Sequence, residues 1–153
     1  MEVIKHNTFE DNRGSYTPIP LNIKGINWTQ CSISINTSKY TFRGLHYQTN
    51  PPQTKYIKVI QGIIVDFMVD LESLELEMAI LSNKDAVFIP SNKAHGFLTL
   101  APDTIVSYLV EGEYNPESEH SIVWYTIPEL KDLIGDIVNP HKLFISEKDE
   151  KGK

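Results

Sequence analysis

Two histidines in this chain each end a short β-type segment, and such histidines are well placed for proton transfer. His46 lies in the hexapeptide Arg43–Gln48, and His95 follows Ile89-Pro90 in a segment that ends at Phe97. The unperturbed pKa of an imidazole lies near physiological pH, so a strand histidine that faces a cavity can act as a general base. A single histidine is more often an ordinary core or surface residue. Two histidines, a basic residue and a late carboxylate together indicate an enzyme site.

The order of short motifs along the chain resembles that of the dTDP-4-dehydrorhamnose 3,5-epimerase family. The resemblance runs from about Phe9 to Asp149, which is nearly the whole chain. One such motif is weak evidence, whereas six in the same order are specific. The motifs are Arg43–Gln48 with Lys55, Gly62 with Asp66 to Asp70, Ile89-Pro90 with Ala94 to Phe97, Tyr108 to Tyr114 with Pro116, Trp124, and Ser146 to Asp149. The resemblance implies a cupin-type β-barrel, usually a dimer, that inverts sugar carbons next to the ketone of a nucleotide-linked 4-keto-6-deoxyhexose.

The resemblance also implies four catalytic residues. His46 is the base that removes a proton next to the ketone, and Asp149 is the carboxylate that orients it. Lys55 places a positive charge near the developing oxyanion. Tyr108 returns a proton from the opposite face, a role that a phenol can fill because an enolate is strongly basic. From the residues alone, another reading of each stays open: Lys55 as an exposed strand lysine, Tyr108 as a packing aromatic, and Asp149 as one charge in a polar tail.

A second implied set binds substrate. Arg13 and Arg43 match arginines whose guanidinium groups fork onto phosphate oxygens, although Arg13 is equally a solvated turn residue. Tyr114 contacts the nucleotide or the sugar, and Gln48 ends the best-matched motif. His95 either hydrogen-bonds the base or supports the site, and a purely structural role fits it equally well.

The residue types do not favour a metal. Many cupins hold a divalent metal with two histidines separated by one residue, then a carboxylate, then a third histidine. Here Gln48 takes the place of the second histidine, and Lys55 stands where the carboxylate is expected, so that only His46 and His95 fit. A protonated amine has no lone pair to donate and repels a cation. We therefore expect a reaction that needs neither metal nor other cofactor.

The elements that must position these residues are short strands. Turn residues separate the predicted strands 31–36, 56–60, 63–71, 78–81, 86–89, 96–100, 104–110 and 122–125. Gln61-Gly62 predicts a hairpin between the second and third of them. Strands this closely spaced favour a barrel over a parallel sheet, which needs intervening helices. We expect residues 1–153 to form one all-β domain, a cupin-type double-stranded β-helix or jelly-roll barrel, with a short helix near the C-terminus.

Two details of this pattern concern the site. The predicted helix covers Pro128–Ile134 with Gly135 near its end, and the chain beyond Asp149 is polar enough to fray. Alternation places Asp66 on the same strand face as Ile64 and Met68. A carboxylate on a buried face needs a partner, so Asp66 either supports the site from inside the barrel or forms a salt bridge at a strand edge.

Composition excludes several classes of protein. A net charge of −6, from 14 basic and 20 acidic side chains, argues against a protein that grips the phosphates of nucleic acid. Cys31 is the only cysteine, no apolar run reaches membrane-spanning length, and Met1–Lys5 does not begin a secretory signal. We expect a cytoplasmic enzyme with a nucleotide-sugar substrate and no nucleic-acid or membrane partner. The polar segment 1–20 cannot form a core alone, so we expect it to pair in a homodimer.

Some positions depart from the family pattern. Tyr16 alone keeps the aromatic character of the stretch after Arg13-Gly14, Ser32 stands where the family usually has an asparagine, and Tyr125-Thr126 follows Trp124 in place of Asn-Asp. The catalytic set is therefore retained more fully than the nucleotide pocket. Three alternatives remain: an epimerase acting at C3 only, one acting on a GDP- or UDP-linked sugar, and a barrel that binds sugar nucleotides without turnover.

Overall fold

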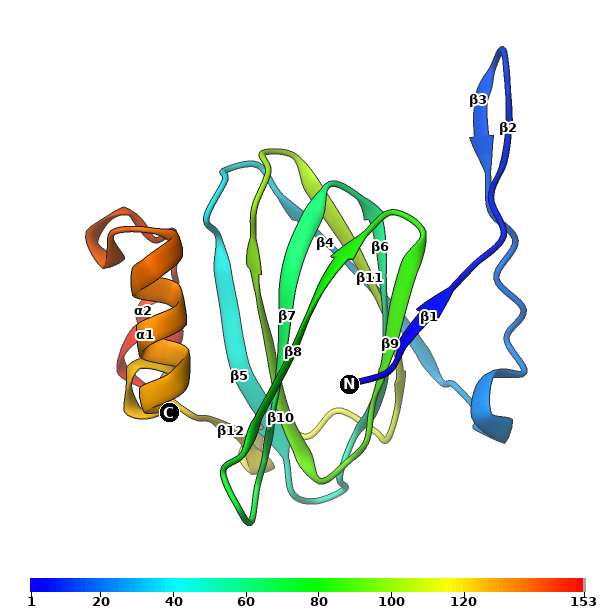
Figure 1. The fold of residues 1–153 in the computed structure, drawn as a ribbon. Coiled ribbons are helices and arrows are strands. Elements are labelled where there is room, and N and C mark those ends of the chain that lie inside the picture. The colour runs from blue at the N-terminus through cyan, green and yellow to red at the C-terminus, as the bar shows by residue number, and fades with distance from the viewer. Residues whose placement is uncertain (153) are drawn as a thin grey trace.

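Two five-stranded sheets packed face to face form the body of the molecule in the computed structural model, which describes residues 1–152 (Figure 1). The first sheet has the order β1 (Val3–Lys5), β9 (Asp85–Ile89), β6 (Thr54–Gln61), β11 (Thr104–Glu111) and β4 (Gln30–Asn36). The second has the order β12 (Glu119–Ser121), β5 (Phe42–Gln48), β10 (Lys93–Thr99), β7 (Ile63–Asp70) and β8 (Leu76–Ser82). The predicted all-β jelly-roll barrel is confirmed.

Two hydrophobic cores hold this arrangement together. One lies between the sheets and contains Ile64, Met68 and Phe97. The other lies outside the second sheet, where Val65 and Phe67 pack against helix α1 (Pro128–Ile137). Strand β7 therefore buries both of its faces, which explains why its sequence is an almost unbroken apolar run. Asp66 lies on the inner face with Ile64 and Met68, as alternation predicted.

The predicted hairpin at Gln61-Gly62 is wrong. Strand β6 pairs with β9 and β11 in the first sheet, whereas β7 pairs with β8 and β10 in the second. The chain thus crosses between sheets at Gly62, which has a φ of +89° and lies so close to Thr104 that a Cβ atom would collide with it. A glycine turn between two apolar strands looks the same in sequence whether the strands pair or face each other, because both arrangements bury the same residues.

The segment 122–125 is also not the strand that was predicted. The strand is β12, and Trp124–Thr126 forms the short 3-10 helix η3 that leads into α1. The Trp124 ring lies 6.3 Å from that of Phe42 and is buried in the outer core. Ile122 still exchanges two backbone hydrogen bonds with Leu45 of β5, whereas from Trp124 onward the burial of this large side chain beneath the helix fixes the backbone.

The C-terminal part contains more helix than was predicted. Helix α1 continues through Gly135 to Ile137, because the glycine faces open space and only loses helix propensity there. The tail forms a second short helix, α2 (Glu147–Lys151), instead of fraying after Asp149. Ser146 caps this helix by accepting a 3.2 Å hydrogen bond from the Asp149 amide.

The N-terminal segment divides into two parts. Strand β1 joins the first sheet beside β9, whereas β2 (Phe9–Asp11) and β3 (Gly14–Tyr16) form a hairpin that projects away from the barrel (Figure 1). The remaining elements are the 3-10 helices η1 (Ile23–Gly25), η2 (Pro116–Ser118) and η4 (Pro140–Lys142). No helix within residues 1–152 is long and apolar enough to cross a membrane.

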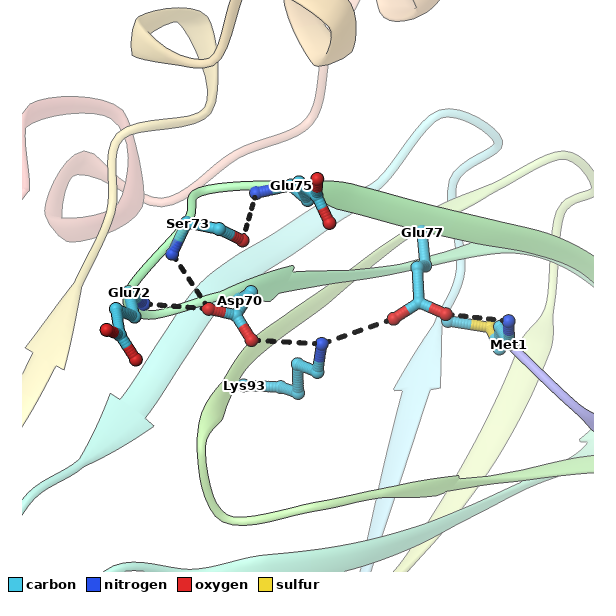
Figure 2. A network of polar contacts seen from close by, with 7 residues as sticks. All are labelled: Met1, Asp70, Glu72, Ser73, Glu75, Glu77 and Lys93. Carbon is cyan, nitrogen blue, oxygen red and sulfur yellow. Dashed lines mark hydrogen bonds and ion pairs between the residues drawn. The ribbon is translucent and has the colours of Figure 1, made fainter.

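A chain of ion pairs crosses the seam between the sheets (Figure 2). Lys93 donates to Asp70 at 3.2 Å and to Glu77 at 3.3 Å, and Glu77 accepts from the amino group of Met1 at 2.8 Å. Asp70 also accepts from the backbone amides of Glu72 and Ser73. The network therefore links the segment before β1 to three strands of the second sheet.

Candidate active site

A cavity of about 320 Å³ lies between the two sheets, and both sheets contribute to its wall. The first sheet supplies Ser32, Ser34, Lys55 and Tyr108, and the second supplies Arg43, His46, His95 and Phe97. A larger basin of about 910 Å³ adjoins it, and Gln30 and Tyr114 line both. Six of the predicted site residues therefore share one cavity: Arg43, His46, Lys55, His95, Tyr108 and Tyr114.

His46 is held by Asp149, as the resemblance implied. The Nε2 of His46 lies 2.6 Å from Oδ1 of Asp149, and the Gly44 amide donates to Oδ2 at 3.1 Å. Burial alone would raise the pKa of the Asp149 carboxyl, but the hydrogen bond and the charge of His46, with the Gly44 amide, hold that pKa below its usual value. An ionised carboxylate only accepts, so His46 donates through Nε2 and keeps Nδ1 as its basic nitrogen.

Gly44 lets two cavity residues share a face of strand β5. Arg43 and His46 both line the cavity although three positions separate them, a spacing that puts residues of a regular strand on opposite faces. The register of β5 against β10 shifts between His95 and Phe97, and Gly44 has a φ of +129° at this irregularity. A Cβ atom on Gly44 would lie 2.6 Å from the Cα of Gly96, so a side chain at position 44 would force the strands apart.

Lys55 brings a partly desolvated ammonium group to the cavity. Burial lowers its pKa, while the negative charges of Glu119 and Asp66 act in the opposite direction. The side chain comes from β6, next to the strand that carries Tyr108. A cation of this kind stabilises negative charge on a nearby oxygen more strongly than it would in water.

Tyr108 presents a neutral phenol on the first sheet, and His46 lies on the second. Burial raises the pKa of Tyr108 to about 12, and the hydrogen bond with Ser34 opposes that rise. The two hydroxyl oxygens are 3.2 Å apart, and the ring packs 6.3 Å from that of Phe97. The phenol therefore keeps its proton at neutral pH and is fixed by contacts on two sides.

His95 pairs with Asp66 and not with the other histidine. Its Nε2 lies 2.7 Å from Oδ1 of Asp66, a fully buried carboxyl whose pKa is raised by burial. The other carboxyl oxygen, Oδ2, has no hydrogen-bond partner within residues 1–152. His95 lies directly opposite His46 in the β10–β5 ladder, so the two imidazoles stand side by side on one wall. Of the two readings of Asp66, support from inside the barrel is the one that its position favours.

The predicted substrate-binding set is only partly brought together. Arg43 donates to Asn36 at 2.7 Å, which anchors its guanidinium in the cavity wall. Gln48 is buried outside the cavity lining, where its side chain bonds the backbone of Pro51, Glu113 and Asn115. The Gln48 amide thus fixes the loop that carries Tyr114. This position outside the cavity lining corrects the prediction that Gln48 contacts the substrate.

Arg13 is not brought to the cavity of its own chain. It lies in the β2–β3 hairpin, 85% exposed, and forms an ion pair with Asp11. Within one copy of residues 1–152, the solvated turn reading therefore describes this arginine. The two apolar side chains of this hairpin, Phe9 and Tyr16, are exposed and do not pack against the barrel of the same chain.

Two features of the site were missed in the sequence: the serines of β4 in the cavity wall, and Glu119, which bonds the cavity residue Tyr114. Alternation in β4 does place Ser32 and Ser34 on one face, so that pattern was available. Glu119 had no local signal, because it begins the three-residue strand β12 in a polar stretch without apolar alternation. Its carboxylate accepts from Tyr114 at 2.8 Å and from Lys148 at 3.1 Å.

The donor set at the cavity does not suit a metal. Residues 1–152 contain no group of three or more His, Cys, Asp or Glu side chains arranged to hold an ion. His46 and His95 each bond a separate carboxylate, and the cavity also holds the ammonium of Lys55. Metal independence remains a prediction that rests on these residue types.

Comparisons with known proteins point to one family. A family model described as dTDP-4-dehydrorhamnose 3,5-epimerase matches residues 1–153. The enzyme of that name from Mycobacterium tuberculosis is 34% identical over 110 residues, which cover 67% of this chain and 52% of that protein. The chain thus spans about half the length of this curated relative.

Two solved structures extend the likeness to nearly the whole fold. The dTDP-4-dehydrorhamnose 3,5-epimerase of Bacillus anthracis, with TDP and pyrophosphate bound, has a TM-score of 0.78 and 32% identity, covering 97% of this chain and 90% of that chain. The dTDP-6-deoxy-D-glucose-3,5-epimerase of Legionella pneumophila, in complex with dTDP-4-keto-L-rhamnose, has a TM-score of 0.82 and 29% identity, covering 99% and 85%.

Proposed function

This chain belongs to the dTDP-4-dehydrorhamnose 3,5-epimerase family, and we propose on that premise that it inverts C3, C5 or both in a dTDP-linked 4-keto-6-deoxyhexose. Such a reaction belongs to deoxysugar and surface polysaccharide biosynthesis. The observation that carries the proposal is the placement of His46 and Tyr108 on facing sheets of one cavity. Inversion requires proton removal on one face of a carbon and delivery on the other, and a base and an acid on opposite walls meet that need.

His46 acts as the base in this proposal. Its Nδ1 removes the proton next to the ketone, and the resulting imidazolium is stabilised by the Asp149 carboxylate at 2.6 Å. Lys55 stabilises the enolate oxygen that forms at C4. Tyr108 then donates its proton to the opposite face of the carbon, which completes the inversion, and solvent restores both groups.

The residues around the cavity mouth bind the nucleotide in this proposal. Arg43 supplies a guanidinium for a phosphate oxygen, and Tyr114 stands at the border between the cavity and the larger basin. A substrate made of a sugar and a nucleoside needs two connected spaces, which the cavity and the basin provide. His95 contacts the sugar from the wall that also holds His46.

A homodimer is part of the proposal. Strand β4 is an edge of the first sheet, and its Ile33 and Ile35 side chains are about two-thirds exposed, as are Phe9 and Tyr16 in the hairpin. Exposed edges and apolar patches of this kind are usually covered by a partner. A second copy that covered them would also give the β2–β3 hairpin a surface, and could bring Arg13 to a phosphate.

We place the enzyme in the cytoplasm because its lone thiol, Cys31, is exposed.

Solvent exchange tests the function directly. The protein is incubated in D₂O with dTDP-linked 4-keto-6-deoxyglucose, and the sugar protons are followed by NMR. Deuterium at C3, C5 or both, with a change in ring coupling constants, is the expected result and identifies which carbon is inverted. Absence of exchange with dTDP-, GDP- and UDP-linked forms, together with tight binding of one of them, would replace the epimerase by a binding protein.

A further inference from the structure

Glu119 stands between two parts of the site that are far apart in the chain. Its Oε2 accepts a 2.8 Å hydrogen bond from the hydroxyl of Tyr114, and its Oε1 accepts a 3.1 Å bond from Nζ of Lys148. Tyr114 lines both the cavity and the basin, and Lys148 directly precedes Asp149 in α2. One carboxylate thus contacts a wall of the pocket and the helix that supports His46.

We propose that Glu119 is a positioning residue that ties Tyr114 to helix α2, so that nucleotide binding in the basin and the geometry of the His46–Asp149 pair are coupled. The inference rests on the proposed function and adds to it a residue and a role. Glu119 acts through Tyr114 and Lys148, so its effect on the reaction is indirect.

Helix α2 depends on side-chain contacts for its position. It has five residues, and a helix this short is not stable without tertiary contacts. Its anchors are the Ser146 cap, the bonds of Asp149 to His46 and Gly44, and the ion pair of Lys148 with Glu119. Loss of the ion pair between Lys148 and Glu119 frees Lys148, which directly precedes Asp149, and leaves the two hydrophobic cores intact.

Glu119 is suited to this role because its own strand is fixed. Strand β12 pairs with β5, with Glu119 opposite Gln48 and Ser121 opposite His46. The carboxylate therefore sits on the same ladder as the proposed base, two residues along. Tyr114, in contrast, lies in an irregular segment and is half exposed, so its backbone restricts the ring little. The hydrogen bond to Glu119 is therefore the main restraint on the position of the ring.

The charge of Glu119 also acts on Lys55. Burial lowers the pKa of Lys55, and Glu119 is the foremost of the negative charges that oppose this. The charged or titratable groups around Glu119 and Lys55 are His46 and Arg43 on β5, Asp66 on β7, His95 on β10, Tyr108 on β11, Tyr114, and Lys148 and Asp149 on α2. Removing one negative charge from this set lowers the pKa of Lys55 further, so the alkaline limit of activity moves to lower pH.

The test is a set of substitutions built around one carboxylate. Glu119→Gln keeps the shape and an acceptor for Tyr114 but loses the charge, Tyr114→Phe removes only the hydroxyl, and Lys148→Met removes only the ammonium. Calorimetry with TDP measures binding, and deuterium exchange measures chemistry. Glu147→Gln is the matched control, because it removes an ion pair with Lys151 from the same helix.

We expect Glu119→Gln to weaken TDP binding and to slow exchange by about tenfold each, the size of one charged hydrogen bond. Adding Tyr114→Phe or Lys148→Met to it should change either quantity by less than about twofold, because residues in one network are not additive. The alkaline limb of the exchange rate should shift to lower pH in Glu119→Gln. Glu147→Gln should match the unsubstituted protein in all three measurements.

Two results with Glu119→Gln and its control would overturn the inference. If Tyr114→Phe and Lys148→Met have the same effects in the Glu119→Gln background as in the unsubstituted protein, these residues act independently of Glu119. If Glu147→Gln has as large an effect as Glu119→Gln, the cause is a general loss of charge. An unmoved alkaline limb would remove the link to Lys55. If Glu119→Gln fails to fold, the Tyr114→Phe/Lys148→Met double variant replaces it: additive single effects refute the coupling. Exchange by the unsubstituted protein is measured first, so failure of the epimerase proposal is seen separately, and TDP binding still tests the coupling.

Discussion

The imidazole of His46 and the carboxylate of Asp149 lie 2.6 Å apart although 103 positions separate them in the chain. The pairing depends on α2, which brings a buried, charged carboxylate behind strand β5. Because the carboxylate can only accept, it fixes the neutral imidazole as the tautomer with a free Nδ1. The same bond stabilises the imidazolium once a proton has been taken up.

His46→Asn should remain folded and should abolish deuterium exchange at the sugar carbons. Asparagine is too short to reach Asp149 as Nε2 does, but the buried carboxylate keeps the Gly44 amide as a donor, whereas no basic nitrogen remains at position 46. NMR of the sugar in D₂O and a melting curve check the two parts. The exposed His141 provides the matched control, since His141→Asn makes the same change on η4. Exchange at the unsubstituted rate by folded His46→Asn would remove the assignment.

Tyr108→Phe should separate exchange from inversion. The change removes one oxygen and keeps the ring against Phe97, so packing is nearly undisturbed. His46 can still remove a proton and return it on its own face, so exchange should survive while net inversion falls by about 10²–10⁴. Product configuration by NMR coupling constants gives the measurement, and Tyr125→Phe, outside the cavity, is the control. If inversion proceeds at the original rate, the acid is Tyr114 or a water molecule.

Chelation should leave both activity and melting temperature unchanged. The cavity offers two imidazoles that are each engaged by a carboxylate, and an ammonium, which is a poor set for a divalent cation. Dialysis against EDTA followed by exchange and melting measurements, with metal analysis of freshly purified protein, checks this. A stoichiometric transition metal whose removal stops the exchange would contradict it.

Asp70→Asn should destabilise the protein at neutral pH but not in acid. The backbone amides of Ser73 and Glu72 and the ion pair with Lys93 lower the pKa of Asp70 to about 2. The pKa of an unfolded aspartate is about 4, so a folded pKa below that value stabilises the native state above about pH 4. This contribution disappears as the pH falls from about 4 to about 2. Melting temperatures across that range should therefore converge for the two proteins, while Glu72→Gln, in the adjacent turn, should show no such difference.

The protein should behave as a dimer, with about twice the 17.4 kDa mass of one chain. Ile35→Glu on the exposed face of β4 should shift the mass towards the monomer, because a charge cannot be buried unpaired in an apolar contact. Light scattering at micromolar concentration measures both proteins. Lys131→Glu on α1 is the control at a distant face. A monomer from the unsubstituted chain would refute the dimer.

The sequence alone determined seven strands, β4 and β6 to β11, and six of the residues that line the cavity. Alternation and turn residues mark β4, β7 and β11, because these signals depend on local conformation and on which face is buried. The same alternation placed Asp66 inside the barrel. Motif order pointed to His46, Lys55 and Tyr108, all of which line one cavity.

Only the tertiary structure decided how those residues are combined. The crossing at Gly62, the strand irregularity at Gly44 that turns Arg43 and His46 to one side, and the exposed position of Arg13 all follow from how the sheets close. The partners of Gln48 and Glu119 are equally invisible in the sequence. A buried polar group must find a hydrogen-bond partner, but local sequence does not say which distant segment provides it. That choice is made when strands remote in the chain pair and the two sheets pack together.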